Sequence, residues 1–131
     1  MRLLLDTHTF LWLADGSPRL SATATGLLTD PANDLLLSMA SVWEIAIKVN
    51  IGKLALASPY PAYIADAVSG YRLTLLPLVQ DDCDFYSTLP FPHANHRDPF
   101  DRMLIVQSLR LGLPVVGVDA NFDAYGVTRL W

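Results

Sequence analysis

Four acidic side chains occupy positions from which they could bind one divalent cation together. Asp6 and Asp119 each end a short apolar run, and Asp101 lies in the first turn of an expected helix. Glu44, the only glutamate among thirteen acidic residues, has apolar neighbours on both sides. Because ligands of open parallel sheets bind beyond the carboxyl ends of the strands, we expect these four carboxylates to converge at one edge of a sheet.

Such a convergence of negative charge has a chemical consequence. Carboxylates held close together repel one another, so some would bind protons unless a cation compensated them. Oxygen ligands without a cluster of histidines or cysteines favour Mg²⁺ or Mn²⁺. His93 and His96 have H-x-x-H spacing but no further nitrogen or sulfur ligands nearby, so zinc is the less favoured alternative. A hydrated Mg²⁺ or Mn²⁺ ion suits phosphodiester hydrolysis, because it activates water and stabilises charge on phosphate.

Helix capping is a structural alternative for each acid. Asp98 precedes a proline and lies three residues before Asp101, which fits an N-cap with a capping box. Ser41 and Glu44 fit a second capping box, and Asp6 could cap the helix that follows it. Capping explains Asp98 completely. It explains Glu44 least well, because a carboxylate among apolar side chains needs a partner or a cation.

Three basic residues flank the acidic segments and are candidates for holding a nucleic-acid backbone: Lys48, Arg97 and Arg102. The formal net charge is −4 and the pI is about 5.0. This balance excludes a protein that holds nucleic acid by bulk positive charge, so any such contacts must be local.

The rest of the chain alternates between strand and helix patterns. Strands are expected at 2–6, 34–38, 73–78, 114–119 and 127–131, and helices at 10–16, 21–30, 38–52, 58–72, 79–89 and 100–111. This alternation predicts an α/β fold with a central, mainly parallel sheet and helices on both faces. The length of 131 residues fits a single domain.

The composition indicates a cellular location and the presence of protein partners. Hydrophobic residues make up 52% of the chain and the mean hydropathy is +0.32, so we expect apolar surface that an oligomer or a protein partner covers. No apolar run reaches the roughly 20 residues of a membrane span. The N-terminal apolar run is interrupted by Asp6 and does not resemble a signal peptide. A single cysteine, Cys83, fits a reducing cytoplasm.

Four motifs in order, LLLDTHTFLW, SMASVWEIAIKVNIGKL, HRDPFDRMLIVQS and VDANFDAYGV, resemble the PIN-domain ribonucleases, specifically the VapC-type toxins of bacterial and archaeal type II toxin–antitoxin pairs. The resemblance covers essentially the whole chain. It implies a three-layer PIN fold over 1–131, Mg²⁺- or Mn²⁺-dependent RNA cleavage, homodimerisation, and a cognate antitoxin that packs on an apolar groove beside the site. By position it assigns catalysis and metal binding to Asp6, Glu44, Asp101 and Asp119, with Thr7 as a small polar residue that helps the site.

One position departs from the family pattern. Many relatives have Ser or Thr two residues before the last aspartate, where this chain has Gly117, and Asn121 could substitute as the supporting polar residue. Two alternatives stay open: a phosphoryl-transfer domain using Asp6 with the pair Asp81 and Asp82, and a non-catalytic PIN-like binding module. The sequence identifies neither the RNA target nor whether one or two metal ions bind.

Overall fold

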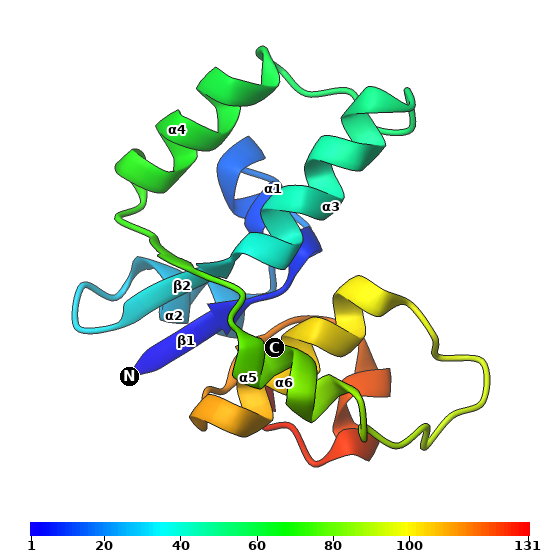
Figure 1. The fold of residues 1–131 in the computed structure, drawn as a ribbon. Helices are drawn as coiled ribbons and strands as arrows, with labels where there is room; N and C mark the ends of the chain where they lie inside the picture. The colour runs from blue at the N-terminus through cyan, green and yellow to red at the C-terminus, as the bar shows by residue number, and fades with distance from the viewer.

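A five-stranded parallel sheet forms the centre of the computed structural model, which describes residues 1–131 (Figure 1). The strands run in the order β3-β2-β1-β4-β5, and every neighbouring pair is parallel. Their bounds are β1 Arg2–Leu5, β2 Asp34–Ser38, β3 Thr74–Leu76, β4 Val115–Val116 and β5 Arg129–Leu130. All carboxyl ends therefore lie at one edge, as the sequence predicted.

Six α-helices and one 3₁₀ helix connect the strands. They are α1 Thr7–Asp15, α2 Ala22–Thr29, α3 Met39–Asn50, α4 Tyr60–Gly70, α5 Gln80–Tyr86, α6 Pro99–Leu111 and η1 Ala120–Tyr125. Gly16 and Gly112 end α1 and α6 in the left-handed conformation, with φ of 63° and 67°. Glycine adopts this conformation without the steric penalty of a Cβ, which is why both helices stop there.

The strands are buried on both faces, and this divides the core in two. Leu3 and Leu5 of β1 pack in one cluster with α1 to α4, whereas Leu4 between them packs in the other with α6 and η1. Successive strand side chains point to opposite faces, so a continuous apolar strand requires helices on both sides. Figure 1 shows α5 and α6 together on one side, with α1, α3 and α4 on the other. The predicted three-layer α/β fold is confirmed.

Several local predictions were wrong. β3 and β4 are shorter than the predicted strands at 73–78 and 114–119. The segment after β4 forms η1, for which the sequence predicts no helix or strand. The helix α3 starts at Met39, because the Ser38 hydroxyl accepts a hydrogen bond from the N–H of Ala40. Ser41 therefore lies inside α3 and is not its N-cap. No helix combines the length and apolar character that crossing a membrane requires.

Candidate functional site

Asp6 and Asp119 follow neighbouring strands, and each caps the helix that comes next. Asp6 Oδ1 accepts the N–H of Thr9 at 2.7 Å, and Asp119 Oδ1 accepts the N–H of Asn121 at 2.9 Å. In each cap one carboxylate oxygen accepts the hydrogen bond, and this fixes the direction of the second oxygen of the same carboxylate. Capping and metal binding are thus compatible for both residues. Asn121 supports Asp119 through its backbone, while its own side chain is exposed.

Gly117, where the resemblance led us to expect Ser or Thr, lies in close contact with Asp6. A Cβ at Gly117 would lie 2.6 Å from Asp6 Oδ2 and 3.0 Å from its carboxyl carbon. Any larger residue would have to displace the Asp6 carboxylate from its present position. Because residue 117 is a glycine, the Asp6 carboxylate fits between β1 and β4, where Asp6 is only 6% exposed.

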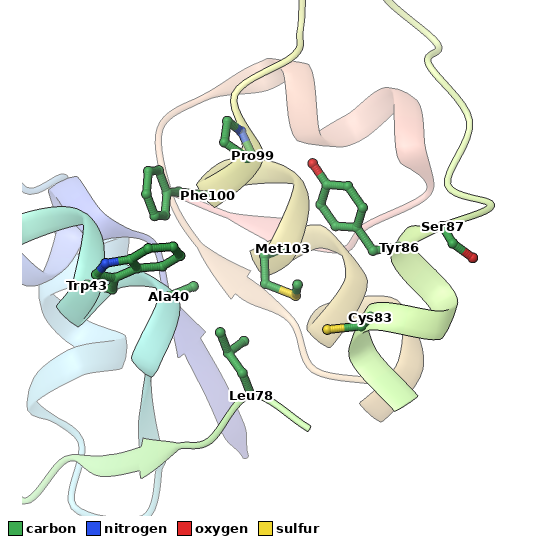
Figure 2. A pocket seen from close by; sticks show the side chains of 9 residues that line it. All are labelled: Ala40, Trp43, Leu78, Cys83, Tyr86, Ser87, Pro99, Phe100 and Met103. Atoms are coloured by element: carbon green, nitrogen blue, oxygen red, sulfur yellow. The ribbon is translucent and has the colours of Figure 1, made fainter. Parts of the chain in front are cut away.

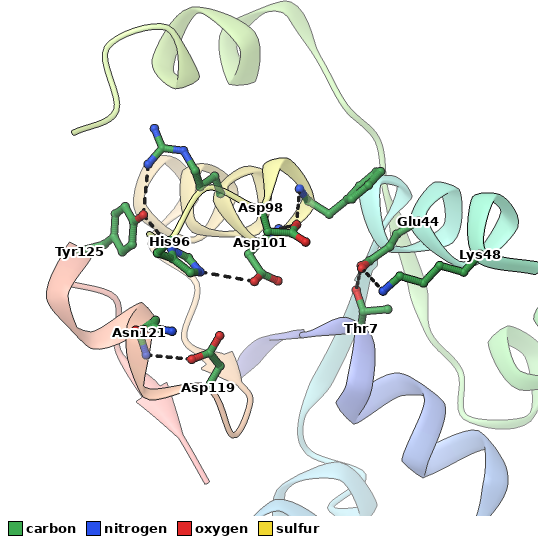
Figure 3. Close-up of polar contacts among 11 residues, drawn as sticks. Thr7, Glu44, Lys48, His96, Asp98, Asp101, Asp119, Asn121 and Tyr125 are labelled. Atoms are coloured by element: carbon green, nitrogen blue, oxygen red, sulfur yellow. Dashed lines mark hydrogen bonds and ion pairs between the residues drawn. The ribbon is translucent and has the colours of Figure 1, made fainter. Parts of the chain in front are cut away.

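Glu44 is buried but fully partnered. Its Oε1 lies 2.7 Å from the Thr7 hydroxyl and its Oε2 lies 2.7 Å from Lys48 Nζ, one helical turn further along α3 (Figure 3). The Thr7 hydroxyl is also 2.9 Å from that of Ser41. A buried carboxylate needs such partners, and here they come from α1 and from α3 itself. Lys48, one of the predicted backbone contacts, lies at the rim of the site with its ammonium group paired to Glu44.

Asp101 lies in the first turn of α6, which Asp98 caps. The Asp98 carboxylate accepts the N–H of Phe100 at 2.8 Å and that of Asp101 at 3.0 Å, which confirms the predicted cap. The Asp101 carboxylate does not complete a capping box and instead faces the other acids (Figure 3). Burial, and then the charges of Asp98, Glu44, Asp119 and Asp6, raise the pKa of Asp101 to about 7. Burial also raises the pKa of Asp6.

His96 joins the site, although sequence reasoning did not assign it there. One ligating atom each from His96, Asp101 and Asp119 lie within 4.8 Å of one another. Asp6 and Glu44 lie outside this compact group, so the four acids share an edge without being equally close. His93 lies outside it as well and is exposed. The sequence signals for His96 were its H-x-x-H spacing with His93, which suggested zinc, and its position five residues before Asp101.

The two arginines predicted to hold a nucleic-acid backbone differ in position. Arg97 is exposed, and its Nε donates to the Ala94 carbonyl oxygen at 3.0 Å. Arg102 is 1% exposed and donates to the carbonyl oxygens of Leu89 and Pro90, both at 2.9 Å. A buried, bonded guanidinium cannot reach a phosphate, so we correct the prediction for Arg102: it anchors the loop before α6.

The donor set fits a hard divalent cation. Asp6, Asp101 and Asp119 offer carboxylate oxygens, and repulsion between the acids contributes to the raised pKa of Asp101. Mg²⁺ and Mn²⁺ prefer oxygen ligands, and binding one would compensate this repulsion. The residues at this edge are therefore compatible with a divalent cation.

The raised pKa of Asp101 predicts that cation binding depends on pH. The folded-state pKa of about 7 exceeds the ordinary aspartate pKa of 3.8, so the proton stabilises the metal-free fold at low pH, and this stabilisation is lost as pH rises through 7. Below pH 7 a cation must displace that proton, and its affinity should fall about tenfold per pH unit. Mn²⁺ titrations followed by electron paramagnetic resonance between about pH 5 and pH 8 measure this. An affinity independent of pH would contradict the assignment.

The sequence of this chain matches a known protein family and a curated protein. A family model described as PIN domain matches residues 3–127. The curated protein Ribonuclease VapC16 of Mycobacterium tuberculosis is 43% identical over 53 residues, which is 37% of this chain and 38% of that protein. The match therefore spans well under half of the curated relative.

Solved structures share the fold over nearly the whole chain. VapBC2 from Rickettsia felis, bound to a DNA fragment from its promoter, superposes with a TM-score of 0.72 at 12% identity, covering 98% of this chain and 97% of that one. VapC20 from Mycobacterium tuberculosis, described as a sarcin-ricin loop cleaving toxin, gives a TM-score of 0.66 at 16% identity, covering 95% of both chains. Identities this low establish similarity of fold alone.

Proposed function

The chain belongs to the PIN-domain family, and from this premise we propose that it is a metal-dependent endoribonuclease acting as the toxin of a toxin–antitoxin pair. The observation that carries the proposal is the position of Asp101. Its pKa is raised to about 7 by burial, by the charge of Asp98 at the start of the same helix, and by Glu44, Asp119 and Asp6 from three other segments. A fold that keeps such a group beside Asp119 at the carboxyl edge of the sheet is suited to hold a cation.

The residues at this edge have distinct roles in the proposed reaction. Asp101 and Asp119 would hold Mg²⁺ or Mn²⁺ directly. Asp6, at the end of the neighbouring strand, is a further proposed ligand outside this compact group, and the paired Glu44 contributes negative charge beside them. A bound ion of this kind lowers the pKa of a coordinated water and stabilises the charge that develops on the phosphate. The helix caps keep Asp6 and Asp119 oriented. The exposed Arg97 is the remaining candidate for an RNA phosphate contact that is free of an ion pair.

The similarity to VapC16 supports ribonuclease activity over the alternatives. The phosphoryl-transfer alternative required Asp81 and Asp82 beside Asp6. Asp82 is fully buried and instead binds Arg110, with 2.7 Å between Oδ1 and Nε, while its Oδ2 caps the N–H of Val79 at 3.0 Å. It ties α5 to α6 and is unavailable to the site.

Cleavage of RNA by the purified chain tests the proposal. We expect cleavage in Mg²⁺ or Mn²⁺ and none in EDTA, with recovery when the ion is restored. An Asp101→Asn preparation purified in the same way reports contaminating nuclease. Intact RNA under all metal conditions, while the preparation binds Mn²⁺ normally, would favour the non-catalytic module.

The proposed partners fit apolar surfaces on two sides of the site. A hollow of about 410 Å³ between α1 and α3 includes Leu11, Trp12 and Leu54 and borders Thr7 and Lys48. We propose that the antitoxin packs there, as the VapC-type resemblance implies. Toxicity of the chain on expression, relieved by a small neighbouring gene product, would support this pairing and a cytoplasmic location; no toxicity would count against the toxin assignment.

A second apolar hollow, of about 450 Å³, lies between α3, α5 and the start of α6 (Figure 2). Trp43, 59% exposed, packs edge-to-face on Phe100 at 5.4 Å between ring centroids. Leu78, Val79 and Phe85 are each more than a third exposed. We propose that a second copy of the chain covers this surface, because homodimer interfaces have apolar cores. A monomeric mass by sedimentation at micromolar concentration would contradict the dimer.

A further inference from the structure

Four hydrogen-bonded side chains lead from the interior to Asp101 (Figure 3). Arg102 Nη1 donates to the Tyr125 hydroxyl oxygen at 3.1 Å. That hydroxyl is 2.8 Å from His96 Nδ1, and His96 Nε2 is 3.4 Å from Asp101 Oδ2. The series begins on a buried cation and ends on a carboxylate that the proposed function assigns to metal binding.

The buried arginine sets the direction of these hydrogen bonds. A guanidinium can only donate, so the Tyr125 oxygen is an acceptor towards Arg102. The hydroxyl proton of Tyr125 is then directed to its other neighbour, His96 Nδ1. A neutral imidazole that accepts at Nδ1 carries its proton on Nε2, the nitrogen that faces Asp101.

Packing holds the imidazole in this orientation. His96 is 7% exposed, and its ring lies edge-on to Phe122 and Tyr125, at 6.2 Å and 5.5 Å between centroids. Arg102 also fixes the loop that carries His96, through the carbonyl oxygens of Leu89 and Pro90. A ring flip would put Cδ2 in the place of Nδ1 and Cε1 in the place of Nε2, and it would break the contacts with both Tyr125 and Asp101.

We propose that His96 is a positioning residue: its Nε2–H donates to Asp101 and orients that carboxylate as an oxygen ligand, so His96 does not itself bind the ion. This role rests on the proposed metal site, whereas the position of the proton does not. Ligating carboxylates are commonly held by such outer hydrogen bonds, and losing one costs roughly 10- to 100-fold in metal affinity.

The nitrogen of His96 that carries the proton can be observed directly by ¹⁵N nuclear magnetic resonance of the metal-free protein at about pH 8. We expect the proton on Nε2 of His96 and a mixture of tautomers in Tyr125→Phe. Tyr86→Phe is the matched control, because the Tyr86 hydroxyl makes no hydrogen bond in this structure and its ring also lies near Arg102. A proton on Nδ1 of His96 in the wild-type protein would overturn the proposal.

Mn²⁺ affinity tests the positioning role without measuring RNA cleavage. His96→Leu should weaken Mn²⁺ binding about 10- to 100-fold, and His96→Gln, which keeps a donor, should recover part of the loss. Tyr125→Phe should weaken binding less than His96→Leu, and it tests the same series if His96→Leu does not fold. Unchanged Mn²⁺ affinity in folded His96→Leu, or in Tyr125→Phe, would overturn the role. If Mn²⁺ affinity changes in these variants as expected but the wild-type protein cleaves no RNA, the proposed function is refuted and the positioning role of His96 is not.

Discussion

Replacing Asp101 with asparagine is expected to abolish RNA cleavage and, at the same time, to stabilise the metal-free protein. The first effect follows from losing a charged ligand at the position where the ion would act, which costs several kcal/mol of transition-state stabilisation, or roughly a thousandfold in rate. The second follows from the pKa of about 7, because ionising Asp101 in the fold opposes burial and the neighbouring acids. Residues that serve a function often reduce stability in this way.

The stability change should itself depend on pH. The pKa shift from 3.8 to about 7 sets an upper limit of about 4 kcal/mol at 1.36 kcal/mol per unit. The Asp101 side chain is 31% exposed, so solvent screening reduces the expected gain to about 1–3 kcal/mol at pH 8. Near pH 4 the folded Asp101 is neutral and the unfolded one is only partly ionised, so the gain should fall below about 1 kcal/mol. Urea unfolding in EDTA at both pH values measures the difference.

Asp98→Asn is the matched control for this variant. Asparagine is as good an N-cap as aspartate, so α6 should keep its start while one negative charge near Asp101 is removed. We expect Asp98→Asn to retain cleavage and to lower the pKa of Asp101, because the Asp98 charge contributes to raising it. Full activity of Asp101→Asn, or a loss of stability in that variant at pH 8, would contradict the assignment of Asp101.

Local patterns were sufficient for the sheet and for most of the acidic site. The run at 34–38 is apolar without alternation because β2 is covered on both faces, and its bounds were predicted correctly. Asp6 and Asp119 were placed at one edge because parallel strands share the direction of their carboxyl ends. The η1 helix could not be predicted, since its six residues show no helical periodicity and depend on the cap by Asp119.

The residues that the sequence misassigned depend on contacts between distant segments. His96 lies in a loop, and its direction is fixed by Tyr125, 29 residues away. Ser41 and Glu44 have the spacing of a capping box, but Ser38 caps α3 first. Arg97 and Arg102 flank the same acidic motif and have the same charge. Only the path of the loop at 89–96 determines that one is exposed and the other is buried.

Arg102→Met should therefore lower the free energy of unfolding by roughly 3 kcal/mol. Methionine keeps an unbranched apolar chain that can pack against Phe91, whose ring centroid lies 3.7 Å from the guanidinium carbon. It leaves the buried carbonyl oxygens of Leu89 and Pro90 without their donors, and hydrogen bonds to a charged group contribute about 1.5–3 kcal/mol each. The Nε of Arg102 has no partner, and removing it offsets part of this loss.

Arg97→Met provides the comparison, because Arg97 is exposed and has the same side-chain chemistry. Its free energy of unfolding should change by no more than about 0.5 kcal/mol, the range of ordinary surface substitutions. Its RNA affinity should fall, with a salt dependence reduced by about one phosphate contact. Urea unfolding of both variants together with RNA binding at several salt concentrations separates the two roles. Equal stability of the two variants would show that the guanidinium of Arg102 does not hold the loop, and a loss of RNA affinity confined to Arg102→Met would restore it as the phosphate contact.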